Sequence, residues 1–342
     1  MKKKILVTGG TGYIGSHTTV ELINEGYEVV IIDNLYNSEA EVADRICQIT
    51  GIRPSLEVFD LCDRDKLNSF FKSNSGISAV IHFAAYKAVG ESVNKPLEYY
   101  RNNLVSLMNL LEEMKVNGVH HLVFSSSCTV YGQPEKLPVT ESAPLQPATS
   151  PYGYTKQVGE SIIRDTTVSD PDIKAISLRY FNPIGAHPSA LIGELPRGVP
   201  ENLVPYITQT AYGLRDELKV FGDDYDTPDG SCVRDYLHVV DLAKAHVVAV
   251  NRLINGRNKA SYEVFNLGTG TGVSVLEAIS SFERVSGVSL KYKITGRRAG
   301  DIEKIWADPS FANKELGWKT KSTLDEAMKT AWDWEKQIRK KS

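Results

Sequence analysis

Tyr152 and Lys156 stand four residues apart in the stretch Ser-Pro-Tyr-Gly-Tyr-Thr-Lys, residues 150–156. Residues at this spacing share one face of an α-helix, so a helix here would place an ammonium group beside a phenol. A free tyrosine loses its proton near pH ~10, and its use as a base near neutrality needs about 4 kcal/mol in favour of the phenolate. A neighbouring lysine cation supplies part of that free energy. The pair therefore predicts a tyrosine base, provided that other active-site residues accompany it.

Ser127 is the third candidate for chemistry. It follows the run His121–Ser126, which is typical of a buried β-strand. A serine hydroxyl both donates and accepts a proton, so Ser127 can bridge Tyr152 and a substrate hydroxyl. We expect Ser125 and Ser126 to end the strand or contact a cofactor. The predicted catalytic group is therefore Ser127, Tyr152 and Lys156.

The elements that must position this group begin near the start of the chain. The run Lys4–Thr8 is typical of a buried parallel strand, and a helix is expected over Ile14–Glu25. Between them, residues 9–15 contain both G-x-G-x-x-G and the shifted G-x-x-G-x-x-G spacing of short-chain dehydrogenase/reductases. Glycines at such a turn let backbone N–H groups approach a pyrophosphate at the helix N-terminus. The segment predicts a dinucleotide-binding turn.

Asp33 indicates which dinucleotide would bind there. It ends a second expected strand, Tyr27–Ile32, about twenty positions after the glycines. An acidic side chain at this place holds the 2′-hydroxyl of the adenosine ribose and repels a 2′-phosphate. The sequence therefore predicts NAD rather than NADP as the cofactor.

Short β-branched runs alternate with longer amphipathic stretches through the first half of the chain. This alternation predicts an α/β fold with a doubly wound, Rossmann-like parallel sheet, in which ligands lie beyond the carboxyl ends of the strands. We expect residues 1–180 to form the NAD-binding domain, with a later segment of about 234–255 returning to it. Residues 181–342 would form mainly a second, smaller α/β substrate-binding domain. The further expected strands are Leu56–Val58, Ala79–His82, His121–Ser126 and Ile173–Tyr180.

The composition favours a cytoplasmic enzyme. The 342 residues carry 39 Lys and Arg against 42 Asp and Glu, a net charge of −3, which argues against nucleic acid or an anionic membrane as a partner. No stretch is apolar for long enough to cross a bilayer, and the apolar run after Met1–Lys4 stops at Thr8, too early for a signal peptide. The four cysteines are scattered, as expected of reduced thiols, and predict no metal site.

Longer motifs carry a resemblance to a known family along nearly the whole chain. The sequence resembles the extended short-chain dehydrogenase/reductases and, within them, the UDP-hexose 4-epimerases. The matching stretches are Val7–His17, His82–Ala85, Lys87–Val93, Ser125–Gly132, Arg179–His187, Val233–Val239 and Arg298–Asp301.

This resemblance implies inversion at C4 of a UDP-hexose with a tightly held NAD that is neither consumed nor released. Tyr152 as phenolate would take the O4 proton, Lys156 would favour the phenolate and contact the nicotinamide ribose, and Ser127 would hold O4. The oxidised sugar would then turn its other face to the cofactor. The implied cofactor-binding residues are Gly9, Gly12, Tyr13, Ile14, Gly15, Asp33, Asn34, Asp60, Leu61, Phe83, Ala84, Lys87, Asn102, Ser125 and Tyr180.

The same resemblance implies a set of UDP-sugar contacts and a gate. Family members that reject N-acetylated sugars tend to carry tyrosine where Ile305 stands, and those that accept them carry a small residue. Isoleucine is intermediate, so UDP-galactose and UDP-glucose are the expected substrates, and UDP-N-acetylglucosamine or dual specificity is the alternative. The implied substrate-binding residues are Asn182, Asn202, Leu203, Phe221, Arg234, Arg298, Asp301 and Ile305.

Two rival functions share part of this pattern. A nucleotide-sugar 4,6-dehydratase would use the same tyrosine, lysine and NAD turn, but that family carries Asp-Glu where Cys128 and Thr129 stand. A non-catalytic NAD-sensing protein would have no need of the catalytic group. Family resemblance also implies a homodimer, formed through helices around Pro96–Lys115 and Ser150–Val168.

Two further motifs are not assigned a ligand. Gly268–Gly272 resembles a phosphate loop, but Ser274 before an apolar stretch predicts an ordinary strand-to-helix turn with a serine N-cap. Asp223–Gly230 resembles a calcium loop, but proline and aspartate replace expected ligand and glycine positions, so we expect an acidic loop.

Overall fold

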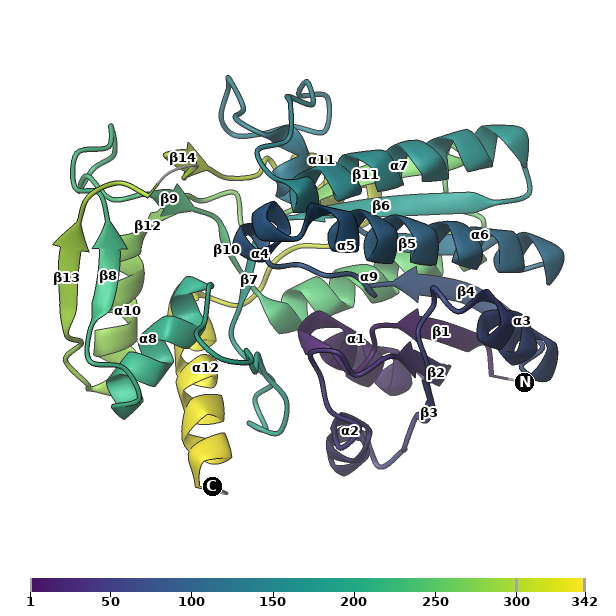
Figure 1. Ribbon diagram of the computed structural model, residues 1–342, viewed down its shortest axis with the longest axis horizontal. Helices are drawn as coiled ribbons and strands as arrows, with labels where there is room; N and C mark the ends of the chain where they lie inside the picture. Colours follow the sequence, from purple (N-terminus) through teal and green to yellow (C-terminus); the bar gives the residue numbers. More distant parts are fainter. Residues whose placement is uncertain (1, 299–300, 341–342) are drawn as a thin grey trace. The chain divides into compact units, whose positions relative to one another are not determined.

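The computed structural model describes residues 2–298 and 301–340 (Figure 1). The chain divides into two compact units, and it passes between them several times. The first unit comprises Met1–Gly132, Leu145–Arg179 and Ala243–Phe265, and the second comprises Gln133–Pro144, Tyr180–Leu242 and Asn266–Ser342. The assignment of NAD to residues 1–180 and of the sugar nucleotide to residues 181–342 stays a prediction.

The first unit is built on a seven-stranded sheet in the order β11-β6-β5-β4-β1-β2-β3. β1 pairs in parallel with both β2 and β4, so the strand order reverses at β1 and β4. This confirms the predicted doubly wound sheet, and it directs attention to the carboxyl ends of these strands. The strands are β1 Lys4–Thr8, β2 Glu28–Asp33, β3 Ser55–Val58, β4 Ile77–His82, β5 His121–Ser125, β6 Lys174–Tyr180 and β11 Tyr262–Leu267.

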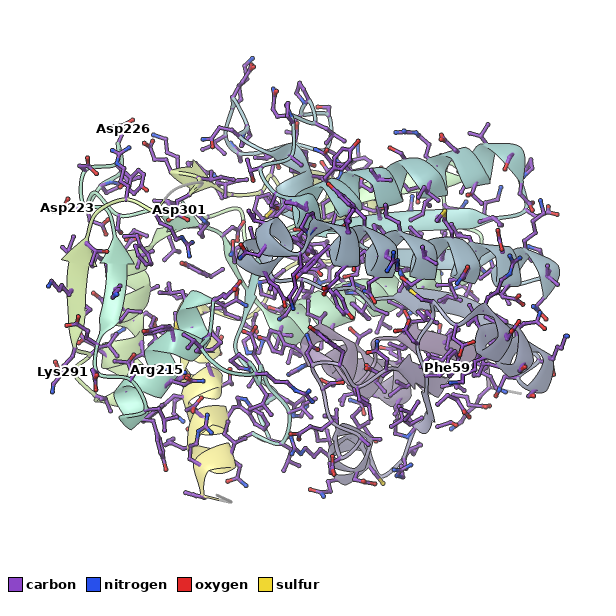
Figure 2. The ribbon with its side chains drawn as sticks, in the orientation of Figure 1. Phe59, Arg215, Asp223, Asp226, Lys291 and Asp301 are labelled. Atoms are coloured by element: carbon purple, nitrogen blue, oxygen red, sulfur yellow. The ribbon has the colours of Figure 1, made fainter. Side chains whose placement is uncertain are left out.

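Helices cover this sheet because its central strands are apolar on both faces. Leu107, Leu110 and Ile163 pack with Leu6, Val80 and Leu122 in one buried cluster, so the helices that carry them lie on the same face. Phe59, just after β3, packs at the margin of this cluster (Figure 2). The helices of this unit are α1 Tyr13–Asn24, α2 Val42–Thr50, α3 Arg64–Ser73, α4 Val89–Asn94, α5 Pro96–Tyr100, the π-helical turn η1 Arg101–Val105, α6 Ser106–Val116, the 3₁₀ turn η2 Cys128–Tyr131, α7 Pro151–Ser169 and α9 Val239–Ile254, which begins in the second unit.

Helix α7 begins where local sequence signals place it. Ser150 is its N-cap, with its hydroxyl accepting a hydrogen bond from the N–H of Gly153 at 3.1 Å, and Pro151 occupies the first turn. Farther along, a Cβ on Gly159 would lie only 3.0 Å from the ring of Phe124 on β5. The glycine lets the helix lie close to the sheet. Tyr152 and Lys156 are thereby held in the first two turns, next to the end of β5.

A buried ion pair joins α7 to β6. Arg179 donates to the Glu160 carboxylate from Nε at 2.9 Å and from Nη2 at 2.5 Å, and both side chains are less than 10% exposed. The same carboxylate accepts a hydrogen bond from Ser126 at 2.6 Å, and Arg179 also donates to Tyr131 at 2.9 Å. These four side chains connect helix α7, two strand ends and the turn η2.

The second unit has its own core between helices and short strands. Ile207, Phe282, Met328 and Trp332 pack together, and they join α8, α10 and α12. The stretch 182–205 contains the strand β7 and the start of α8. The elements are β7 Asn182–Ile184, α8 Leu203–Tyr212, β8 Leu218–Phe221, β9 Val233–Arg234, β10 Tyr236–His238, β12 Val273–Ser274, α10 Val275–Ser286, β13 Tyr292–Thr295, β14 Lys304–Ile305, α11 Ser310–Glu315 and α12 Leu324–Arg339.

The short strands of this unit form three small sheets. β10 pairs with β7, β13 pairs with β8, and β9 lies between β12 and β14. Among residues 2–298 and 301–340, no helix is both long and apolar enough to cross a membrane.

The buried ion pair predicts a large loss of stability when one charge is removed. Glu160→Gln leaves the Arg179 cation buried without its counter-charge, so we expect the free energy of unfolding to fall by about 3–5 kcal/mol. Glu112 pairs with Arg64 at the surface, where both side chains are more than half exposed, so Glu112→Gln is the matched control with an expected change below about 1 kcal/mol. Urea unfolding midpoints measure both changes. Equal effects of the two substitutions would contradict this account.

Candidate active site

The glycine turn after β1 has room for backbone alone. Gly9 has φ +71°, and a Cβ there would lie 2.8 Å from the backbone nitrogen of Ala84. A Cβ on Gly15 would lie 2.2 Å from the carbonyl oxygen of Gly9. Among the described residues at the start of α1, Gly12 is the N-cap without a side-chain cap, and the first turn holds no acidic residue. The partial positive charge of this helix end therefore suits an anionic pyrophosphate, so the residues present fit a dinucleotide.

Asp33 is fixed in place at the end of β2. Its carboxylate accepts hydrogen bonds from the N–H of Thr11 at 3.1 Å, the N–H of Leu35 at 2.9 Å and the hydroxyl of Ser38 at 3.1 Å. Since a carboxylate has about four lone-pair positions, it retains capacity for a further donor such as a ribose hydroxyl. The carboxylate also lies beside the turn that would hold the pyrophosphate.

The remaining residues predicted for the adenosine side lie at neighbouring strand ends. Asn34 donates to the Asp60 carboxylate at 3.1 Å, and Asp60 also accepts the N–H of Cys62 at 2.8 Å. Leu61, which stands between Asp60 and Cys62 in the sequence, is buried. These contacts join the segments that follow β2 and β3, as expected for the edge of a parallel sheet where ligands bind.

The loop after β4 passes close to the glycine turn. The N–H of Phe83 donates to the carbonyl of Thr8 at 3.0 Å, and Ala84 approaches Gly9 as described above. Lys87 lies over the ring of Tyr13, with its Nζ 5.8 Å from the ring centroid. The loop thus brings predicted cofactor-binding residues from two parts of the chain together.

Ser127 lies in the segment after β5, which packs against the first turns of α7 that carry Tyr152 and Lys156. All three side chains are buried, with exposures of 6%, 7% and 4%. Lys156 donates from Nζ to the carbonyl oxygen of Ser125 at 2.7 Å, and its Nζ lies 5.8 Å from the ring centroid of Tyr152. The hydroxyl of Ser127 accepts a hydrogen bond from the N–H of Thr129 at 3.2 Å. The expected helix geometry is present, and an ammonium group faces the phenol ring.

Burial controls the electrostatics around Lys156. It lowers the pKa of Lys156 to about 8, against an opposing effect of the Glu160 carboxylate one turn along α7. Burial, followed by the charge of Lys156, lowers the pKa of His82 to about 3. His82 is therefore neutral, and its Nδ1 shares a hydrogen bond of 2.8 Å with the hydroxyl of Thr8. Lys156 therefore changes charge within the neutral to weakly alkaline range.

Several buried polar residues near this group were not identified from the sequence. Glu160 lies one turn beyond Lys156, and Thr155 donates to the carbonyl oxygen of Tyr152 at 2.7 Å. Asn103, in the π-helical turn η1, lies next to the predicted cofactor residue Asn102, which donates to its side-chain oxygen at 2.9 Å. Two adjacent asparagines within a helical stretch were the sequence signal available for η1.

The residues predicted to contact the sugar nucleotide lie in the second unit, and several of them touch. Arg298 forms an ion pair of 2.6 Å with Asp301, and its guanidinium lies 5.2 Å from the ring centroid of Phe221. Ala299 and Gly300, between them in the matched motif, lie outside the described residues. Figure 2 shows Asp301 on the segment between β13 and β14. Asp301 therefore orients the guanidinium of Arg298, which the resemblance implies as a UDP-sugar contact.

A strand pairing places the predicted gate residue beside the other predicted substrate-binding arginine. Arg234 on β9 and Ile305 on β14 are register partners in a parallel pairing, and Ile305 is 2% exposed. Asn182 begins β7, and Tyr180 ends β6. Asn202 is the N-cap residue of α8, directly before Leu203, and its side chain donates to Glu194 at 2.7 Å.

The Gly268–Gly272 turn holds a carboxylate of the protein itself. Asp235, which is fully buried, accepts hydrogen bonds from the N–H of Thr269 at 2.8 Å and the N–H of Gly270 at 3.2 Å. The N-cap prediction for Ser274 is confirmed, since its side chain forms a capping box with Glu277 at the start of α10. The backbone of this turn therefore binds an internal anion rather than presenting its N–H groups to a ligand.

Comparisons with known proteins agree with this geometry. The model of the "NAD dependent epimerase/dehydratase family" matches residues 5–268. The UDP-glucose 4-epimerase of Bacillus subtilis is 53% identical over 331 residues, which cover 97% of this chain and 96% of that protein.

Two crystal structures are also similar over nearly their whole length. The UDP-glucose-4-epimerase of Stenotrophomonas maltophila, with bound NAD and formylated UDP-arabinopyranose, has a TM-score of 0.96 at 48% identity and covers 99% of this chain and 100% of its own. The Bifidobacterium longum enzyme, in complex with NAD⁺ and UDP, has a TM-score of 0.94 at 48% identity, with 98% and 99% covered. These findings confirm the resemblance predicted from the motifs, and the chain belongs to the NAD dependent epimerase/dehydratase family.

Proposed function

We propose that this chain is a UDP-glucose 4-epimerase, which interconverts UDP-galactose and UDP-glucose with a tightly held NAD. The observation that carries the proposal is the buried group formed by Lys156, Tyr152 and Ser127 at the end of β5. The relatives described above, at about half identity over nearly the full chain, support the same activity. A bound NAD would supply a hydride acceptor and donor for C4 of the sugar.

The residues that would hold NAD follow from the strand ends of the first unit. The backbone N–H groups of Gly9–Gly15 would bind the pyrophosphate at the start of α1. Asp33 would accept the adenosine ribose hydroxyls, and its negative charge disfavours the 2′-phosphate of NADP. Lys156 would contact the nicotinamide ribose, because its Nζ already lies at the carboxyl end of β5 through its bond to Ser125.

Proton transfer is assigned to Tyr152. As phenolate it would accept the O4 proton, and the Lys156 ammonium would stabilise that phenolate more strongly in a buried site than in water. The Ser127 hydroxyl would hold O4 and steady the proton between sugar and tyrosine. On the return step the same phenol would donate the proton back. The chain thus uses one acid–base group for both directions.

Sugar inversion requires firm nucleotide contacts and loose sugar contacts. The guanidinium groups of Arg234 and Arg298 would pair with the diphosphate, a geometry that suits their planar donors. A sugar site that gripped one epimer tightly would oppose the rotation that presents its other face. We therefore assign specificity for the nucleotide to the substrate-binding residues of the second unit.

Dehydratase chemistry is not favoured for this chain. Expulsion of water from C5 and C6 of the sugar requires an added carboxylate acid and base, whereas η2 carries Cys128 and Thr129 at the corresponding place. The alternative of an N-acetylated substrate depends on Ile305 and is tested below.

We also propose that the enzyme acts as a cytoplasmic homodimer. Helix α7 lies beside the row formed by α5 and α6 (Figure 1), and these helices expose Leu97, Met108, Tyr154 and Val168 by 76%, 41%, 49% and 77%. Exposed apolar side chains gathered on neighbouring helices favour an interface. None of the four cysteines, all of which lie within the described residues, forms a disulfide, which is consistent with a reducing compartment.

The proposed activity predicts turnover without added cofactor. Purified protein incubated with UDP-galactose alone should produce a stable mixture of UDP-galactose and UDP-glucose, because each catalytic cycle restores the bound NAD. Ion-exchange chromatography of the nucleotide sugars measures the mixture. Absence of UDP-glucose from protein that demonstrably contains NAD would refute the proposal.

Removal of the proposed base should separate cofactor binding from catalysis. Tyr152→Phe deletes one hydroxyl from a buried ring, so the variant should retain NAD while turnover falls by about three or more orders of magnitude. Tyr154→Phe, on the exposed side of the same helix, is the matched control. Turnover of Tyr152→Phe close to that of the control would rule out this base.

The lowered pKa of Lys156 predicts the alkaline limit of activity. At pH values below its pKa of about 8, the Lys156 side chain is charged and stabilises the phenolate. At higher pH the charge is lost, so kcat should fall as the pH rises through 8. Lys156→Arg keeps a cation to higher pH and should shift this limb upward, even at a lower maximal rate. A pH–kcat profile measures it, and an unmoved limb in Lys156→Arg would assign it to another group.

The gate proposal predicts a change in substrate preference. Ile305→Tyr adds bulk at the position paired with Arg234, so activity on UDP-N-acetylglucosamine should fall relative to activity on UDP-glucose. Ile305→Val is the control for altered packing at a buried position. The ratio of kcat/KM for the two substrates is the measurement, and an unchanged ratio in Ile305→Tyr would remove this side chain from the gate.

A further inference from the structure

We propose that Tyr36 and Tyr86 form an aromatic strap that retains the adenosine half of NAD. The strap is the contact between the two rings, which joins the loop after β2 to the loop after β4. The inference rests on the proposed function, which requires a cofactor that stays bound, and it deepens that function by naming side chains that slow the release of the cofactor.

The two loops flank the glycine turn that would bind the pyrophosphate. In the sheet, β1 lies between β2 and β4, so a bridge from the loop after β2 to the loop after β4 crosses the carboxyl end of β1. Both loops also reach the turn itself. The Asp33 carboxylate accepts the N–H of Thr11 at 3.1 Å, and the backbone nitrogen of Ala84 would lie 2.8 Å from a Cβ on Gly9. A ligand held by this turn therefore lies between the two loops.

The rings of Tyr36 and Tyr86 close the space between these loops. Their centroids lie 4.5 Å apart and their planes are tilted by 33°, a favourable arrangement for an aromatic pair. Tyr36 is 45% exposed, so its ring lies at the surface and not in the core. The rings can therefore separate without disturbing the packing of the sheet.

Tyr86 is the fixed half of the pair. Its N–H donates to Asn103 Oδ1 at 2.8 Å, and its carbonyl oxygen accepts from Nδ2 of the same amide at 3.0 Å. Its ring also packs edge-on against the buried ring of Tyr99, with centroids 5.5 Å apart. The hydroxyl of Tyr99 accepts the N–H of Ala88 at 3.1 Å and donates to the Glu91 carboxylate at 2.9 Å. Tyr86 is thus held by both its backbone and its ring.

A strained backbone places Tyr36 in its position. Leu35, the preceding residue, has φ +58°, a left-handed conformation that residues other than glycine rarely adopt. The N–H of Leu35 donates to the Asp33 carboxylate at 2.9 Å, and the N–H of Tyr36 donates to the side chain of Asn34 at 3.0 Å. Strain of this kind persists where surrounding contacts hold it, and it is frequent at ligand clamps. The strained turn is therefore consistent with a retaining role for Tyr36.

The strap lies on the adenosine side of the site. Asn34, close to Tyr36 in the chain, donates to the Asp60 carboxylate at 3.1 Å. Burial raises the pKa of the Tyr86 phenol, and the neighbouring Tyr36 phenol and Asp60 carboxylate raise it further, so Asp60 lies near the ring pair. The nicotinamide end is assigned to Lys156, beside β5 and away from β2. The strap can therefore retain the cofactor without restricting chemistry at C4 of the sugar.

Such a strap acts on the rates of both release and entry. The dinucleotide would pass between the rings in either direction, so the contact between the rings raises both barriers. An aromatic pair contributes enough free energy to change each rate by about threefold to tenfold. Side chains that only touched bound NAD would slow its release and leave its entry unchanged. Comparison of the two rates therefore distinguishes a strap from an ordinary contact.

The decisive variant is Tyr36→Ala, which removes the exposed ring. Release is followed by the fluorescence of NADH-loaded protein mixed with an excess of NAD, and entry by mixing cofactor-free protein with NADH. Both rates should rise by about threefold to tenfold in Tyr36→Ala, whereas Tyr36→Phe keeps the ring and should match the wild type. Tyr292→Ala is the matched control, because Tyr292 is also 45% exposed but lies on β13 of the second unit.

A double-mutant cycle tests whether the two rings act as one unit. Tyr86→Ala should accelerate release as Tyr36→Ala does, and the double variant should be no faster than either single variant, because one substitution already opens the strap. If Tyr86→Ala does not fold, the two rates of Tyr36→Ala and Tyr36→Phe still decide the question.

Three results would overturn the inference. They are release from Tyr36→Ala as slow as from the wild type, faster release without faster entry, and effects of the two alanine substitutions that multiply in the double variant. None of these measurements depends on turnover. Failure to convert UDP-galactose would therefore refute the proposed function, while the rates of NADH release and entry would still test the strap.

Discussion

The hydrogen bond from Lys156 Nζ to the carbonyl oxygen of Ser125 is the contact on which the candidate site depends. It joins the first turns of α7 to the end of β5, the place where a doubly wound sheet binds its ligands. An ammonium group loses much of its hydration there, and the low pKa of Lys156 reflects that cost. The carbonyl oxygen, the face of the Phe124 ring at 4.9 Å and the Glu160 carboxylate offset part of it.

The burial of the Lys156 ammonium at the end of β5 also explains the types of the neighbouring residues. Gly159 has no Cβ, so α7 lies close enough to Phe124 for a lysine side chain to reach the strand end. Glu160 cannot stand alone as a buried carboxylate, and Arg179 with Ser126 satisfies it from β6 and β5. The buried Lys156 side chain is thus accompanied by a second, balanced ion pair, Glu160 with Arg179. In the proposed mechanism, catalysis and stability are linked through one turn of α7.

Much of the fold could be predicted from the sequence because its signals are local. Strand β1 has the bounds expected from its apolar run, and strands β2 to β6 differ from expectation by one or two residues. The glycine turn and the Tyr152–Lys156 pair could be recognised because backbone geometry and helix period fix them at short range. Roles assigned to individual site residues stay predictions, since the structure gives their positions and not their chemistry.

Other features depended on contacts between distant segments. The hydrogen bonds of Asn103 join it to Tyr86 and Thr155, which lie 17 and 52 positions away in the sequence. No sequence periodicity predicts these contacts. Asp235 lies 34 positions before the Thr269 N–H group that binds it, so the turn around Gly270 could be discounted as a phosphate loop without its internal anion being identified. The Arg298 and Asp301 pair was recognised by motif, while its contact with Phe221 required the folded second unit.

The central claim is that C4 is oxidised and reduced again by a cofactor that stays bound. Its most direct test is conversion of UDP-galactose carrying deuterium at C4, in ordinary water, followed by mass spectrometry and NMR of the UDP-glucose formed. The account predicts that the deuterium remains at C4 of the product, because the hydride leaves for the bound NAD and returns without meeting solvent. Loss of deuterium to water, or its appearance at another carbon, would contradict it.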